Sequence, residues 1–174
     1  GSSIKKSYLA RGKNRKKFQR YVKQFWNADL FCLQGEGTKE CLMEEFAIPE
    51  SMFIKSGYPR NDILFHATEE FKKELKNKLG LPEDKKVILY CPTWRRYDYK
   101  MHLHFDIEKF KKVLGREYVM LIRSHVGKHA WCDKNNNPIE IFDNEFSFNG
   151  GEYLEATHLY LISDIFISDY SSAI

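Results

Sequence analysis

Three apolar runs separated by helical patterns constrain the fold of this chain more than any other feature. VILY at residues 87–90 has no polar residue, and the segments 117–123 and 164–168 contain similar runs. Such runs are typical of strands that are buried on both faces of a parallel sheet. Strands that alternate with helices over short connections predict an α/β domain built on a parallel sheet.

Helical patterns fill the intervals around these strands. The pattern TEEFKKELKNKLG begins at Thr68, whose side chain can cap the helix, and Gly80 is expected to end it. The segments 106–115 and 151–163 are also predicted to be helical. Nearer the start of the chain, we expect a strand at 28–34, a short helix at 37–49 and a strand at 52–57.

The residues that follow the three apolar strands are rich in hydrogen-bond donors. Ligands of open parallel sheets bind outside the carboxyl ends of the strands, so donors at three such ends predict a site for an anionic ligand. The segments are CPTWRR at 91–96, RSHVGKH at 123–129 and SDYSS at 168–172. The candidate residues are Thr93, Arg95, Arg96, Arg123, Ser124, His125, Ser171 and Ser172.

Simpler interpretations exist for several of these side chains. Arg95 and Arg96 have the character of solvated loop charges as much as of ligand contacts, and Trp94 is expected to be a packing residue. Asp169 is a candidate for holding its turn by bonding backbone amides. The histidines have no recognisable metal-ligand spacing, so we assign no metal ligands and expect no cofactor.

The first 28 residues are strongly basic, whereas the rest of the chain is acidic overall. Residues 1–28 hold nine Lys or Arg and no acid, which leaves 19 bases against 24 acids, or a net charge of −5, in the rest. The aromatic residues in this block recur at helical spacing, and we expect a helix at 14–26. Its aromatic face would pack against its own protein or, alternatively, lie on an anionic membrane surface through the basic residues 5–23.

Other features exclude several protein classes. The four cysteines form no C-x-x-C motif, which favours reduced thiols in a cytosolic compartment. We find no signal peptide and no membrane-spanning run. A nucleic-acid partner is not expected, because the bases are concentrated in one short segment and no DNA- or RNA-binding motif is present.

Four blocks of the sequence together resemble the CDP-glycerol glycerophosphotransferase family, the enzymes that build teichoic acids and related phosphate-linked capsular polymers. The blocks occur in the order of that family and span residues 56 to 172. They are SGYPRNDILF (56–65), VILYCPTWRR (87–96), LIRSHVG (121–127) and DIFISDYSS (164–172).

The resemblance implies a GT-B-like fold of two Rossmann-like domains. Residues 1–66 would end the N-terminal, acceptor-side domain, and residues 67–174 would belong to the C-terminal domain that binds the donor nucleotide. The implied reaction moves glycerol phosphate, or another polyol phosphate, from CDP-glycerol or a related CDP-polyol to a hydroxyl of a lipid-linked or oligosaccharide acceptor, and releases CMP. The implied location is cytoplasmic, peripheral on the inner face of the bacterial cell membrane.

The resemblance also implies roles for individual residues. His125 would bond the donor diphosphate and stabilise the charge that builds on it, with electrostatic support from Arg123. Ser171 and Ser172 would hold the phosphates. Arg60 would lie at the interdomain cleft, and Thr93 and Arg95 would line the nucleotide side.

The family also looks to need an upstream Trp-His-Gly-type motif, and no HG pair occurs in this chain. We therefore expect an interior piece of a larger enzyme that is inactive alone. Two alternatives stay open at this stage. One is a GT-B glycosyltransferase that uses a nucleotide sugar, and the other is a non-catalytic basic module that binds a membrane or another anion.

Overall fold

The computed structural model describes most of the chain in two compact units, residues 1–62 and 63–174. We describe each unit by itself. The described residues are 23, 25, 27–46, 48–93, 101–124, 131–133, 135–151 and 155–169.

The first unit contains two short parallel strands joined through a helix. Strand β1 (Phe31–Cys32) pairs in parallel with β2 (Phe53–Ile54), and helix α2 (Glu36–Phe46) lies between them in the chain. Two turns of 3₁₀ helix follow α2, η1 (Glu50–Met52) and η2 (Pro59–Asn61). These elements confirm the predicted strand–helix–strand order, although each strand is shorter than its sequence pattern.

The helix predicted at 14–26 lies almost wholly outside the described residues. Lys23 and Phe25 are described and are helical. The Phe25 ring packs edge-on against Phe46 of α2, with centroids 4.7 Å apart, and lies 5.7 Å from the ring of Phe31. At Phe25, therefore, the aromatic face contacts its own unit.

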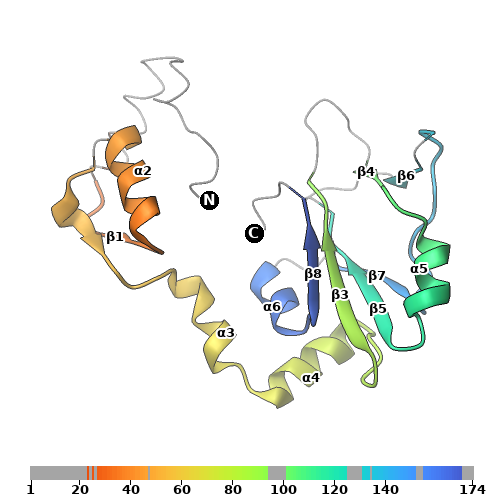
Figure 1. Ribbon diagram of the computed structural model, residues 1–174. Helices are drawn as coiled ribbons and strands as arrows, with labels where there is room; N and C mark the ends of the chain where they lie inside the picture. The colour runs from red at the N-terminus through yellow and green to blue at the C-terminus, as the bar shows by residue number, and fades with distance from the viewer. Residues whose placement is uncertain are drawn as a thin grey trace. The chain divides into compact units, whose positions relative to one another are not determined.

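The second unit is built on a four-stranded parallel sheet with the order β7-β5-β3-β8 (Figure 1). All three neighbouring pairs are parallel. If these four strands are numbered 1 to 4 as they occur in the chain, their order across the sheet is 3-2-1-4, the arrangement that begins a doubly wound sheet. The sheet confirms the predicted α/β class with a parallel sheet. The strands are β3 (Lys86–Cys91), β5 (Tyr118–Ile122), β7 (Ser147–Asn149) and β8 (Ile165–Ser168).

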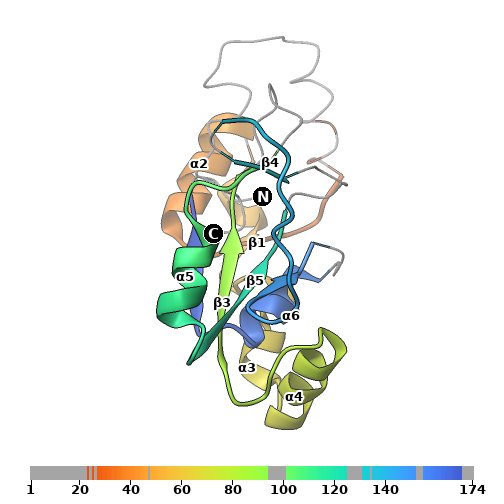
Figure 2. The same ribbon diagram turned by 90° about the vertical axis from the view of Figure 1, so that its right-hand side faces the viewer.

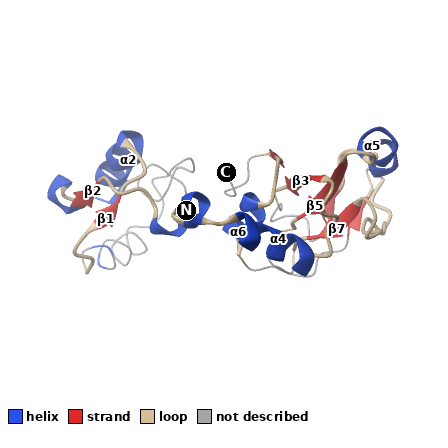
Figure 3. Cartoon of the chain, turned by 90° about the horizontal axis from the view of Figure 1, so that it is seen from below, coloured by secondary structure: helices blue, strands red, loops and turns tan. Residues whose placement is uncertain are grey.

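Helices cover the two faces of this sheet. Helices α4 (Glu69–Lys78) and α6 (Ala156–Leu161) lie on one side, and α5 (Ile107–Leu114) lies on the other (Figures 2 and 3). The short α3 (Ile63–His66) precedes α4 and packs on α6. Because successive side chains of a strand point to opposite faces, β3 and β5 each contribute to both apolar cores.

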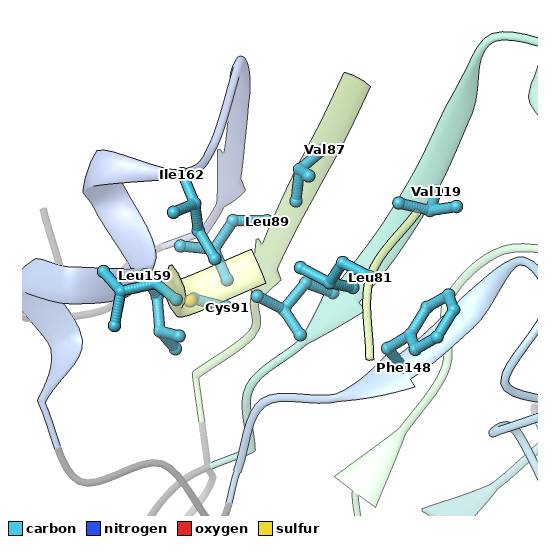
Figure 4. Close-up of a cluster of buried hydrophobic side chains, with 10 residues drawn as sticks. Leu81, Val87, Leu89, Cys91, Val119, Phe148, Leu159 and Ile162 are labelled. Carbon is cyan, nitrogen blue, oxygen red and sulfur yellow. The ribbon is translucent and has the colours of Figure 1, made fainter. Parts of the chain in front are cut away.

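The core under α4 and α6 is formed by alternate residues of the central strands (Figure 4). Leu89, Val119 and Leu159 of α6 are fully buried there. The core under α5 takes the intervening residues, among them Met120 and Ile122, which are also fully buried. After their first residues, β3 and β5 are buried on both faces, which explains why their sequences have no polar alternation.

The helix ends follow the predicted capping chemistry. The Thr68 hydroxyl accepts a hydrogen bond from the Phe71 amide at 3.2 Å, which confirms the predicted cap of α4. Gly80 follows this helix with a φ of 69°, a conformation that favours glycine. Asp106 caps α5 in the same way, accepting from the Lys109 amide at 3.1 Å.

The prediction that β8 is a buried strand is wrong. Ile165, Phe166 and Ile167 are 41%, 40% and 38% exposed. Among the described residues, β8 pairs only with β3, so one edge and part of both faces stay open. The ring of Phe166 is partly covered by Tyr160 of α6, at 5.5 Å between centroids.

The sequence patterns also missed three short strands. Strand β7 lies at an edge of the main sheet, and β4 (Met101–His102) pairs with β6 (Trp131–Cys132) in a separate parallel pair. Cys132, placed in a polar loop by the sequence analysis, is a fully buried residue of β6. The part of the chain that the structure describes contains no helix with the length and apolarity needed to span a bilayer.

Candidate functional site

The carboxyl ends of all four strands of the main sheet lie at one edge, because every pairing is parallel. The residues that follow the strands in the described part of the chain are 92–93 after β3, 123–124 after β5, 150–151 after β7 and 169 after β8. The order of the strands reverses between β3 and β8. Open α/β sheets bind their ligands at this kind of reversal.

Two side chains of the SDYSS segment hold the end of β8 against the end of β3. Asp169 Oδ1 accepts a hydrogen bond from the Thr93 amide at 2.8 Å and another from the Thr93 hydroxyl. The Ser168 hydroxyl donates to the carbonyl oxygen of Cys91 at 2.8 Å. The loops after these two strands are therefore fixed to each other where the sheet reverses.

Backbone hydrogen bonds hold the other strand ends in register. The Arg123 amide donates to the Tyr90 carbonyl at 2.9 Å, which joins β5 to β3. The Gly150 amide donates to the Ile122 carbonyl at 2.8 Å, which joins the end of β7 to β5. All four strand ends are thus tied to a neighbour by at least one hydrogen bond.

A glycine lets the loop after β7 approach the loop after β5. A Cβ atom at Gly151 would lie 2.9 Å from Ser124 Oγ and 3.1 Å from Asn149 Oδ1. The Gly151 amide donates to Asn149 Oδ1 at 2.9 Å, which closes a tight turn beside Ser124. A larger residue at 151 would displace the Ser124 hydroxyl from its place at the edge formed by the carboxyl ends of the strands.

Charges of opposite sign act on the end of β3. Burial raises the pKa of Tyr90 to about 12, and the negative charge of Asp169 adds to this rise. Burial also raises the pKa of Cys91 to about 11, while the positive charge of Arg123 opposes the rise. The site edge therefore carries a cation on the β5 side of β3 and an anion on the β8 side.

The structure brings only some of the predicted site residues together. Thr93 and Arg123 lie at the same edge of the sheet, after adjacent strands. Arg60 belongs to η2 of the other unit, where its guanidinium carbon lies 4.8 Å from the centre of the Tyr58 ring. Arg95, Arg96, His125, Ser171 and Ser172 lie outside the described residues, so their roles stay predictions.

Sequence reasoning gave too little weight to two parts of this edge. Asp169 was expected to stabilise its own turn, but its carboxylate bonds the loop after another strand. Asn149, Gly150 and Gly151 were not predicted to be near the site. Their NGG sequence is a strong turn signal, and it would have placed them here if β7 had been recognised as a strand.

The described residues contain no cluster that could hold a metal ion. No group of three or more His, Cys, Asp or Glu side chains within them has the required arrangement. The His102 ring approaches the carbonyl of Asp133 at 3.4 Å, and its ring centre lies 6.5 Å from that of His104. His102 belongs to β4 of the small β4–β6 sheet, and His104 follows that strand two residues later.

A pocket of about 410 Å³ lies near the opposite end of the main sheet, between α4 and the segment that leads into β8. Three lysines of α4 line it, but two of them are paired with acids. Lys72 lies 2.7 Å from Glu69, and Lys73 lies 3.0 Å from Glu83. The lining holds three acids, Glu69, Glu83 and Asp164, against the three lysines, so the pocket does not have the character of an anion site.

Comparison with known proteins gives a match along the whole chain. The family described as CDP-Glycerol:Poly(glycerophosphate) glycerophosphotransferase matches residues 1–174. The teichoic acid poly(glycerol phosphate) polymerase of Bacillus subtilis is 35% identical over 169 residues, which covers 92% of this chain.

Solved structures of a related protein also match. The wall teichoic acid polymerase TagF superposes with a TM-score of 0.74 at 29% identity, over 97% of this chain. A variant of TagF soaked with CDPG superposes with a TM-score of 0.71 at 32% identity, over 92% of this chain. The chain spans 22% of the Bacillus subtilis polymerase and 42% of the TagF chain.

Proposed function

Because this chain belongs to the CDP-glycerol:poly(glycerophosphate) glycerophosphotransferase family, we propose that it forms part of a polyol-phosphate transferase. The enzyme would move glycerol phosphate, or another polyol phosphate, from a CDP-activated donor to a hydroxyl of a teichoic-acid or capsular-type acceptor, and release CMP. The chain spans less than half of its matched relatives, so the activity is proposed for a longer protein that contains it.

The observation that carries this proposal is the edge between β3 and β8. A sheet of order 3-2-1-4 reverses there, and Thr93 and Asp169 join the two strand ends at that point. Nucleotides bind at such reversals in doubly wound folds. The match to TagF soaked with CDPG, the abbreviation for CDP-glycerol, supports a CDP-linked donor.

The proposed chemistry depends on positioning and on stabilising negative charge. An acceptor hydroxyl would attack the β-phosphate of the donor, and CMP would leave. Phosphoryl transfer gives a protein little covalent work, so cations and hydrogen-bond donors around the phosphates supply most of the acceleration. We propose His125 and Arg123 for this role, and Ser171 and Ser172 for holding the phosphates.

The remaining assignments concern the nucleotide, the domains and the membrane. Thr93 and Arg95 would line the nucleotide side, and Arg60 would lie at the interdomain cleft of a GT-B-like fold. The division into compact units between Asp62 and Ile63 supports a boundary close to residue 66. The basic residues 5–23 would face an anionic membrane surface on its cytoplasmic side, next to a lipid-linked acceptor.

The test is the release of CMP from CDP-glycerol in the presence of an acceptor. We expect release by the longer protein, a loss of about 100-fold or more in its His125→Ala variant, and no release by the 174-residue chain alone. His104→Ala is a matched control, because this histidine is exposed and has no proposed role in the reaction. Near-normal turnover by His125→Ala would contradict the role of His125.

Parallel reactions with other donors separate the alternatives. CDP-ribitol in place of CDP-glycerol tests which polyol phosphate is transferred. Turnover of a nucleotide sugar, without release of CMP from any CDP-polyol, would replace the proposed function with glycosyl transfer. Binding of anionic vesicles without turnover of either donor class would favour a non-catalytic module.

A further inference from the structure

The Thr93 side chain lies where the sheet is expected to meet its ligand, and it is already bonded to Asp169. The two residues follow β3 and β8, the strands between which the strand order reverses. Ligands of open α/β sheets bind at this reversal, outside the carboxyl ends of the strands. The hydrogen bonding of Thr93 therefore decides which ligand group this position can accept.

The bond to Asp169 uses the one proton that the Thr93 side chain can donate. An ionised carboxylate only accepts hydrogen bonds, so both the amide and the hydroxyl of Thr93 donate to Asp169 Oδ1. A hydroxyl has one donor and two acceptor lone pairs. With the donor committed, the hydroxyl can offer only its lone pairs to a ligand, and the negative partner makes it a better acceptor.

This arrangement does not suit a phosphate group. Phosphate oxygens at neutral pH mainly accept hydrogen bonds, so they need donors, and the Thr93 hydroxyl has none left. The nearby charge has the wrong sign as well, because the Asp169 carboxylate lies on the β8 side of β3. Arg123 provides a cation on the β5 side instead, at the adjacent strand end.

We propose that the Thr93 hydroxyl, held by Asp169, accepts a hydrogen bond from an amino or hydroxyl group of the nucleoside part of the ligand and contacts no phosphate. This inference rests on the proposed function, since it assumes a cytidine nucleotide. The donors that a cytidine nucleotide offers are the exocyclic amino group of the base and the hydroxyls of the ribose. Asp169 is then a positioning residue, which acts by fixing the direction of the Thr93 proton.

The test compares nucleotide binding by the longer protein and by its Thr93→Val variant, which replaces the hydroxyl with a methyl group of similar shape. Calorimetry would give the affinity for CMP, for dideoxycytidine monophosphate, for uridine monophosphate and for inorganic pyrophosphate. Dideoxycytidine monophosphate lacks the ribose hydroxyls, and uridine monophosphate lacks the amino group. We expect Thr93→Val to weaken CMP binding by about 3- to 10-fold, as for one neutral hydrogen bond, and to leave pyrophosphate binding unchanged.

The two analogues identify the donor group. One of them should bind the wild-type protein and Thr93→Val equally, and the group that this analogue lacks is the one that Thr93 contacts. Thr93→Ser keeps the hydroxyl and should lose less CMP affinity than Thr93→Val. Three results would each overturn the inference. Thr93→Val could bind CMP as tightly as the wild type does, or it could lose equal affinity for CMP and for pyrophosphate. It could also lose as much affinity for each of the two analogues as it loses for CMP.

Asp169→Ala provides a second route if Thr93→Val folds poorly. This change also removes the fixed direction of the hydroxyl, so CMP binding should weaken, pyrophosphate binding should not, and the loss should disappear with the analogue that lacks the donor group. An unchanged CMP affinity in Asp169→Ala, or an equal loss for CMP and pyrophosphate, would overturn the inference. A wild-type protein that binds no cytidine nucleotide would instead refute the proposed function and, with it, this assignment.

Discussion

Asp164 and Val87 exchange two hydrogen bonds at the start of strands β8 and β3. The Val87 amide donates to Asp164 Oδ2 at 2.8 Å, and the Asp164 amide donates to the Val87 carbonyl at 2.9 Å. The second bond is part of the backbone, but the first depends on the carboxylate. Val87 is fully buried, so its amide has little access to water as a replacement partner.

Asp164→Ala is therefore expected to destabilise the second unit. The loss should be about 1–2 kcal/mol in the free energy of unfolding, because a buried amide loses its acceptor. Urea unfolding followed by circular dichroism would measure it. Asp164→Asn keeps an oxygen in the same place and is the matched control, expected to lose less. Equal stability of the alanine variant and the wild type would contradict the role of this carboxylate.

Asp143 is expected to make stability depend on pH in the acid range. Partial burial raises its pKa, but hydrogen bonds from Lys111 and from the amides of Ser147, Glu145 and Phe146 lower it by more, so the net pKa lies well below its usual range. A carboxyl group whose pKa is lowered by folding stabilises the protein above its unfolded pKa of about 3.9. This stabilisation should be lost as the pH falls further.

Lys111 shows the opposite linkage at the basic end. Its hydrogen bonds to Asp143 and then Glu145 raise its pKa, so its contribution is complete below its unfolded pKa of about 10.4 and is lost as the pH rises beyond it. The ion pair of Lys111 and Asp143 therefore gives its full stabilisation between the unfolded pKa of the aspartate and that of the lysine. This window includes neutral pH.

Asp143→Ala tests this linkage. At pH 7 the variant should unfold with about 1–3 kcal/mol less free energy, because several amides lose one acceptor. Its stability should also fall less steeply than that of the wild type between pH 5 and pH 2. Glu145→Gln is the control, because the Glu145 side chain is 76% exposed and an exposed ion pair contributes little. If the stability of the wild type fell with decreasing pH no more steeply than that of Asp143→Ala, the prediction would be wrong.

The central sheet could be predicted because its strands are buried on both faces. Burial of β3 and β5 demands unbroken apolar runs, and such runs are visible in a single sequence. The cap at Thr68 could be predicted because it is local, whereas Asp106, which caps α5 by the same chemistry, was not singled out. The convergence of the loops also followed, because parallel strands bring their carboxyl ends to one edge.

The features that were missed depend on contacts between distant parts of the chain. Strand β7 has three residues, and its sequence SFN acquires strand geometry only by pairing with β5. The exposure of β8 follows from its place at the edge of the described sheet, whereas its apolar sequence gave no sign of it. The bond from Thr93 to Asp169 joins residues 76 positions apart, which no local pattern can indicate.

Cys91 is expected to be chemically inert at ordinary pH although it lies at the candidate site. Burial raises its pKa to about 11, against the opposing charge of Arg123, so at pH 8 only about one thiol in a thousand is ionised. Cys32 and Cys41 are partly exposed and should be alkylated first. Mass spectrometry after brief alkylation at pH 8 would compare the sites, and unfolding in urea should remove the difference. Labelling of Cys91 as fast as Cys32 would contradict its burial.

Gly151→Ala is expected to impair the site more than the fold. The added Cβ would lie 2.9 Å from Ser124 Oγ and 3.1 Å from Asn149 Oδ1, so the Ser124 side chain has to move. A hydroxyl and an amide oxygen are the ends of small side chains, and the loss of folding free energy should be about 1 kcal/mol. Displacement of a residue at a reacting edge has a larger effect on rate, and we expect kcat/KM for the CDP-activated donor to fall by about 10-fold or more.

Gly37→Ala is the matched control for this change. Gly37 lies in α2, where an added Cβ meets nothing within 4 Å, so alanine should raise stability by about 0.5–1 kcal/mol and leave turnover unchanged. Turnover and thermal unfolding of the longer protein and both variants would separate the two effects. If Gly151→Ala kept full turnover, the loop after β7 would not belong to the reacting edge. If it lost turnover only in proportion to unfolding, its role would be structural.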